Sequence, residues 1–218
     1  MGHLHKTNEQ KTLFVIMLTL LAMLAEISYG YITRSMALLA DGYHMATHAL
    51  ALSLTYIAYL FIKKFKNSDL FPNGTEKIGT LAAYTSALFL GLTGGWMILE
   101  SIGRIRNPLQ IQFDEALLMA VIGLLVNGAC VLIMKGKNHS HAHRHKEDYN
   151  FKAAYLHILA DVLTSVLAIA ALLAGKYLHL SFLDPVIGIL GGFMILRWAT
   201  SLLKKTVQEL IDMKKINS

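Results

Sequence analysis

Cysteine is almost missing from this chain, since Cys130 is the single one among 218 residues. One cysteine excludes a disulfide framework and any metal site built from several thiolates. Charged residues are also scarce, at 16% of the chain against 55% hydrophobic residues. A soluble domain usually carries about 25% charged residues. We therefore expect lipid to be the main solvent of this chain.

Two functional motifs are missing as well. The sequence Gly-x-x-x-x-Gly-Lys-Ser/Thr, which binds nucleotide phosphates, does not occur, so any transport must draw its energy from ion gradients. The first apolar run, from Leu13 to about Ile32, is of full membrane length and continues into further apolar sequence without a cleavage site. We interpret it as a retained helix and not as a secretory signal.

Six apolar runs separated by short charged stretches dominate the sequence. Each run approaches or exceeds the roughly 20 residues that a helix needs to cross about 30 Å of hydrocarbon. The predicted spans are residues 13–32, 35–62, 78–102, 115–135, 153–179 and 183–203. The predicted fold is thus an all-α membrane protein with six transmembrane helices in residues 13–205, an N-terminal segment 1–12, a short tail 206–218 and no sizeable soluble domain.

The basic residues indicate the orientation of these helices. The net charge is +6, but lysine and arginine gather at the ends of the apolar runs, which excludes a continuous nucleic-acid-binding face. One side of the predicted membrane holds most of them, and the other side holds only four: Arg34, Arg104, Arg106 and Lys176. By the positive-inside rule, both termini are expected in the cytoplasm.

Two of the predicted helices each carry a pair of metal-binding side chains. His44 and His48 are four residues apart in the second span, and His157 and Asp161 are four apart in the fifth. Residues four apart share one face of a helix, so two facing helices can supply four ligands to one ion. Three imidazoles and a carboxylate suit zinc, cobalt or nickel better than calcium or magnesium. The alternative is that these histidines only make hydrogen bonds in helix packing.

Other polar residues at membrane depth are expected to support this site or the bundle. Asp41 lies one turn before His44 on the same face and is expected to orient its imidazole or to accept a passing proton, although a plain packing role is the alternative. Glu26, Asn127 and Arg197 are expected to face the bundle interior and to make interhelical hydrogen bonds, because polar groups are costly in lipid.

A histidine-rich loop joins the fourth and fifth spans at residues 136–150. Neutral imidazoles on a loop chelate metal readily, so this loop is expected to capture metal at the cytoplasmic mouth. The alternative is a solvated linker that transport does not need. The histidines concerned are His139, His141, His143 and His145.

These motifs together resemble the cation diffusion facilitator family over nearly the whole chain. The resemblance is carried by the two ligand pairs, the histidine-rich loop and the phrases at residues 35–42, 154–157 and 183–185. It implies a homodimer in a bacterial inner membrane that exports metal by alternating access and proton antiport. His48, where many zinc-transporting members have Asp, resembles the cobalt- and nickel-exporting subgroup.

One departure from the family concerns the end of the chain. Members commonly continue after the sixth helix into a cytoplasmic domain that assists dimerisation and binds regulatory metal, whereas this sequence stops at Ser218. The chain is then either a naturally short member or a truncated one.

The leading hypothesis is a secondary transporter of divalent metal, with cobalt, nickel, zinc and ferrous iron as candidate cargo. No resident cofactor and no nucleic-acid partner are expected; the partners are the lipid bilayer, metal ions, protons and a second copy. Because imidazoles must be neutral to bind metal, protons and metal compete for the site. The alternatives are a membrane metalloenzyme or haem protein that uses the same cluster, and a metal sensor without transport.

Overall fold

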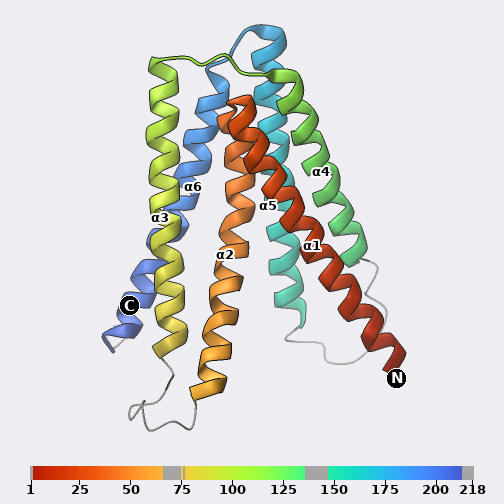
Figure 1. The fold of residues 1–218 in the computed structure, drawn as a ribbon, viewed down its shortest axis with the longest axis vertical. Coiled ribbons are helices and arrows are strands. Elements are labelled where there is room, and N and C mark those ends of the chain that lie inside the picture. Colours follow the sequence, from red (N-terminus) through yellow and green to blue (C-terminus); the bar gives the residue numbers. More distant parts are fainter. Residues whose placement is uncertain (1, 66–74, 76, 136–146, 213–218) are drawn as a thin grey trace.

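Six helices make up almost all of the structure, a computed structural model of the chain (Figure 1). It describes residues 2–65, 75, 77–135 and 147–212, and the side chains of 17–47, 49–51, 53–65, 75, 77–130 and 162–212. No strand occurs among these residues. The helices are α1 (Gly2–Thr33), α2 (Met36–Phe65), α3 (Lys77–Arg106), α4 (Phe113–Lys135), α5 (Glu147–Leu178) and α6 (Leu183–Leu210).

The six predicted spans are therefore confirmed, but the helices extend beyond the apolar runs. Helix α1 begins at Gly2, eleven residues before the predicted span, and α5 begins at Glu147. Between His3 and Tyr29 the sequence contains no glycine or proline that would end a helix. Hydropathy marks where lipid begins, whereas a helix ends only where its backbone is interrupted.

The outer surface of the bundle identifies lipid as its solvent. Within the described residues, four helices are long and apolar enough to cross a membrane, and α1 and α5 add shorter apolar stretches, Met17–Thr33 and Val162–Leu178. Large apolar side chains such as Leu92 and Leu99 are each 72% exposed. An apolar surface this extensive is unstable in water but normal in hydrocarbon. The chain is a six-helix membrane protein.

Helix α2 lies at the centre of the arrangement and contacts α1, α3, α5 and α6. Helices α3 and α6 form a close pair, and glycines make the close contacts possible. A Cβ atom at Gly192 would lie 2.9 Å from the carbonyl oxygen of Gly94, and one at Gly191 would lie 2.8 Å from the Cβ of Ala40. Helix α6 therefore presents a glycine face to both α3 and α2.

The beginning of α1 and the end of α6 lie toward one end of the molecule, as an even number of spans requires (Figure 1). The short connections that follow α1, α3 and α5 lie at the opposite end, called here the outer end. The few basic residues of the sparsely charged side lie at this end, with Arg34 in the connection after α1 at a left-handed φ of 60° and the others in the last turns of α3 and α5. The cytoplasmic location of the termini remains a prediction.

At the outer end, Asp184 of α6 fixes the beginning of α2. Its carboxylate accepts hydrogen bonds from the hydroxyl of Ser35 (2.6 Å) and from the backbone amides of Met36 (2.7 Å) and Ala37 (3.1 Å). These amides have no partner within α2, because they lie in its first turn. A carboxylate from one helix thus caps another, and the favourable dipole of the helix start adds to this contact.

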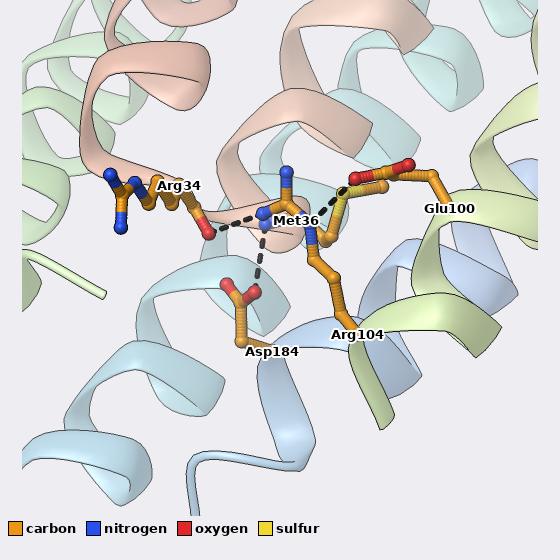
Figure 2. A network of polar contacts seen from close by, with 5 residues as sticks. All are labelled: Arg34, Met36, Glu100, Arg104 and Asp184. Atoms are coloured by element: carbon orange, nitrogen blue, oxygen red, sulfur yellow. Dashed lines mark hydrogen bonds and ion pairs between the residues drawn. The ribbon is translucent and has the colours of Figure 1, made fainter. Parts of the chain in front are cut away.

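Arg104 of α3 joins this region from the other side. Its guanidinium donates to the backbone carbonyl of Arg34 and, over 3.1 Å, to the carboxylate of Glu100 (Figure 2). Hydrogen bonds at the outer end therefore join α6 to the start of α2, and α3 to the connection between α1 and α2.

Candidate metal site

Asp41 and His44 lie on the face of α2 that is turned toward α5 and α6. Both side chains are almost completely buried, at 2% and 1% exposure. They line a pocket between the three helices whose other walls are mostly apolar. The residues that line it are Ala37, Ala40, Asp41, His44, Thr164, Leu167, Ile187, Leu190, Gly191 and Met194. The polar side chains of this pocket are thus an imidazole, a carboxylate and a hydroxyl.

Direct contacts hold these groups in place. The hydroxyl of Thr164 on α5 donates a 2.8 Å hydrogen bond to the carboxylate of Asp41. The imidazole ring of His44 packs against the indole of Trp198 on α6, with 5.1 Å between the ring centroids. Asp41 was predicted to orient His44 or to relay a proton. The structure gives this carboxylate a partner on α5 and tests neither role.

The contact between Asp41 and Thr164 defines the register of α2 against α5, which run antiparallel (Figure 1). Three residues further along α2 is His44, and three residues back along α5 is Asp161. Seven residues in the same directions lead to His48 and His157. Because both helices rise equally per residue, each pair of positions lies at about one level.

The structure describes these predicted ligands unequally. His44 and Asp41 are described in full, whereas for His48, His157 and Asp161 the helical backbone is described but the side chain is not. Among the described side chains, no three metal-binding groups lie close enough to hold one ion. The side chains of three of the four predicted ligands are not among those described. The loop histidines His139, His141, His143 and His145 lie outside the described residues.

The predictions for the other polar residues have mixed outcomes. Glu26 and Asn127 are buried in the bundle as predicted, and the amide of Asn127 contacts the sulfur of Met45 at 3.9 Å. For Arg197 the prediction was wrong, because its side chain is exposed. It lies on the face of α6 that carries Leu190 and Phe193, opposite the glycine face.

Two residues with clear roles were not predicted from the sequence. Thr164 lies three and seven residues after Asp161 and His157, so helical spacing would have found it on the ligand face of α5. Asp184 was noted only as part of a family phrase. An aspartate in the first turn normally interacts with its own helix, and nothing in the sequence indicates that this one caps α2.

The helices and the polar groups in the pocket between α2, α5 and α6 define a polytopic membrane protein with a polar pocket in its interior. Residues 12–211 match the model of the cation efflux transmembrane domain, and the chain belongs to this family, the cation diffusion facilitators. The predicted resemblance to this family is confirmed, whereas the resemblance of His48 to the cobalt- and nickel-exporting subgroup stays a prediction. Members of the family are transporters, which argues against the alternative of a membrane metalloenzyme.

Several named proteins are similar to this chain. The zinc transporter ZitB of Pectobacterium atrosepticum is 34% identical over 211 residues, which cover 97% of this chain and 64% of that protein. A cadmium, cobalt and zinc/H⁺-K⁺ antiporter of Bacillus subtilis is 30% identical over 97% of this chain and 67% of its own length. The probable zinc transporter MSC2 of Saccharomyces cerevisiae is 37% identical over 200 residues, 89% of this chain and 27% of MSC2. The chain thus spans about two thirds of the bacterial relatives.

Proposed function

We propose that this protein exports a divalent transition metal from the cytoplasm in exchange for protons. The ion binds at midmembrane to His44, His48, His157 and Asp161, between α2 and α5. Family membership supports metal efflux in general. The choice of these four ligands and the exchange for protons go beyond what family membership supports.

The observation that carries the proposal is the hydrogen bond between Thr164 and Asp41. It sets a register in which His44 lies level with Asp161, and His48 level with His157. Four ligand residues on two facing helices within about two turns suit one four-coordinate ion. A register shifted by half a turn would turn one of the pairs away from the other.

Zinc is the first candidate for the cargo. Two relatives are named as zinc transporters and a third as an antiporter of cadmium, cobalt and zinc. His48 still favours a softer, nitrogen-rich site, and this keeps cobalt and nickel as candidates beside zinc and iron. The preference depends on position 48, so His48→Asp should shift the selectivity of the site toward zinc.

The proposed setting follows from the charge distribution and from the relatives. With both termini in the cytoplasm, the outer end of the bundle faces the opposite compartment, which in a bacterium is the periplasm. A homodimer is proposed because the family resemblance implies one. Asp41 is proposed to hold the pocket next to His44 in a fixed geometry through Thr164, as outer-shell carboxylates do for metal-bound imidazoles.

The test is uptake of zinc, cobalt and nickel into proteoliposomes under an imposed pH gradient. The wild-type protein is compared with His44→Ala and His157→Ala, and with His179→Ala as a matched control, because His179 is exposed at the outer end of α5. We expect both ligand variants to lose gradient-driven flux and the control to retain it. Flux that persists in His44→Ala and His157→Ala would refute the four-ligand site.

A further inference from the structure

Glu26 of α1 is a fully buried acidic residue that the proposed metal site does not use. Its exposure is 0%, and it lies seven residues, or about 10 Å along the helix, from the end of α1. Two glycines make room for it. A Cβ atom at Gly42 of α2 would lie 3.2 Å from the Cβ of Glu26, and one at Gly123 of α4 would overlap its carboxyl group.

The carboxyl group of Glu26 has no hydrogen-bond partner among the described residues. Both of its oxygens are buried, and neither accepts or donates a hydrogen bond within the described part of the chain. An ionised carboxylate in this position would have lost its hydration without replacement, which costs many kcal/mol. A neutral carboxylic acid avoids most of this cost.

The charged groups around Glu26 reinforce this argument. From α2 the group that interacts with it electrostatically is Asp41, which is also an acid. From α4 the facing residue is Gly123, and the acids of that helix, Asp114 and Glu115, are exposed at its first turn. Cys130 of α4 is directed toward Thr19, at 3.7 Å. Glu26 thus has no described cation to neutralise it.

We propose that Glu26 is a proton-binding site of the transporter, separate from the metal ligands and joined to them through α2. The inference rests on the proposed metal/proton exchange. In the described state, Glu26 carries its proton. When the contact of α1 with α2 and α4 opens to water, the O–H bond breaks, the proton leaves to the aqueous phase and a hydrated carboxylate remains.

Helix α2 provides the link between the two sites. Asp41 and Gly42 are neighbours in sequence and therefore point about 100° apart around the helix. Asp41 faces the pocket of His44 and Thr164, whereas Gly42 faces Glu26. Any movement of α2 that opens the metal pocket also changes the surroundings of Glu26. Protonation of Glu26 thus favours one arrangement of α2, and metal release is coupled to it.

The test compares two transport modes of the reconstituted protein. The first is zinc uptake with and without a pH gradient, and the second is exchange of isotopic zinc at equal pH on both sides. The variants are Glu26→Gln, which keeps the shape but cannot titrate, Glu26→Asp, which keeps a carboxyl group, and Glu115→Gln as the matched control. Infrared difference spectra of wild type against each variant report the C=O band of a protonated carboxyl group.

We expect Glu26→Gln to exchange zinc like the wild type. The stimulation of its zinc uptake by the pH gradient should fall about tenfold, which is the size of a typical coupling between two sites. The protonated carboxyl band should disappear in Glu26→Gln and shift in Glu26→Asp, which should retain stimulation. The spectra of Glu26→Asp decide the protonation state if Glu26→Gln does not fold.

Three results would overturn the inference. Normal gradient stimulation in Glu26→Gln would show that its proton is not used. Loss of zinc exchange in folded Glu26→Gln would assign Glu26 to the metal site or to the structure. A wild-type protein that exchanges zinc but ignores the pH gradient would refute proton antiport itself, and this result differs from the other two because no variant is involved.

Discussion

Asp184 and Glu26 are equally buried acids with opposite surroundings. Their exposures are 1% and 0%. The carboxylate of Asp184 accepts three hydrogen bonds from the start of α2, whereas Glu26 accepts none from the described residues. Burial alone does not indicate what a carboxyl group does. The donors around it separate an acid that holds the fold together from one that is available to bind a proton.

The two positions in the fold explain the difference. Asp184 lies where a helix begins, and the free amides and the dipole of α2 stabilise a negative charge there. Glu26 lies within α1, where every backbone amide is already used by the helix, and its neighbours on α2 and α4 are glycines. Hydrogen-bond donors therefore stabilise a charge at the outer end of the bundle, whereas no described donor does so at Glu26.

The largest expected effect comes from removing Asp184. Asp184→Ala leaves two backbone amides of α2 and the hydroxyl of Ser35 without their acceptor, and we expect a loss of about 3 kcal/mol in the free energy of unfolding. The measurement is chemical unfolding of the detergent-solubilised protein. The control is Glu115→Ala, which removes an exposed acid and should leave the unfolding midpoint unchanged.

Glu26→Gln extends this comparison. Because Glu26 has no hydrogen bond to the described residues that could be lost, its neutral replacement should leave the unfolding free energy nearly unchanged while Asp184→Ala lowers it. Equal losses in Asp184→Ala and Glu26→Gln would contradict the distinction between the two acids.

The next effect concerns the space that Glu26 occupies. Gly123→Ala places a methyl group where the Glu26 carboxyl group lies, and such overpacking should destabilise the protein by about 2 kcal/mol. In a Glu26→Ala background the same substitution should cost much less, since the overlap is gone. The control is Gly128→Ala on the same helix, where nothing lies within 4 Å. Equal costs of Gly123→Ala in both backgrounds would show that the carboxyl group does not fill this space.

The sequence was sufficient to predict the number of helices, and it proposes a ligand face for two of them. Apolar runs of membrane length determine the first, and spacings of four residues determine the second. Neither pattern contains the register of α2 against α5, which depends on the contact of Thr164 with Asp41. That register arises only when both helices are packed, so the sequence alone did not reveal it.

The polar residues outside the ligand pairs show where such predictions fail. Arg197 was expected in the interior because a charge is costly in lipid, but the glycine face of α6 is the one that packs against α2 and α3. For Glu26 an interhelical hydrogen bond was expected. Its neighbours on α2 and α4 turn out to be glycines, which come from distant parts of the chain and offer no side-chain donor.

A smaller effect is expected at the wall of the metal pocket. Thr164→Val removes the hydroxyl that donates to Asp41 and keeps the shape of the side chain. We expect zinc to bind about tenfold more weakly, as is usual when a group behind the ligands is removed. Thr164→Ser, which keeps the hydroxyl, should bind zinc like the wild type. Titration calorimetry of the purified protein measures both, and unchanged affinity in Thr164→Val would show that this contact does not support the metal site.

The smallest effect is expected for a third kind of acid, one that is paired but exposed. Asp212, just after α6, forms an ion pair of 2.8 Å with Lys77 in the first turn of α3, and the two side chains are 76% and 58% exposed. Water and salt screen such a pair, so Lys77→Met should change the free energy of unfolding by about 0.5 kcal/mol or less. Chemical unfolding at low and high salt measures this change. Asp212 resembles Asp184 in having a partner but differs from it in being exposed. A loss as large as that of Asp184→Ala would therefore mean that having a partner matters more than burial.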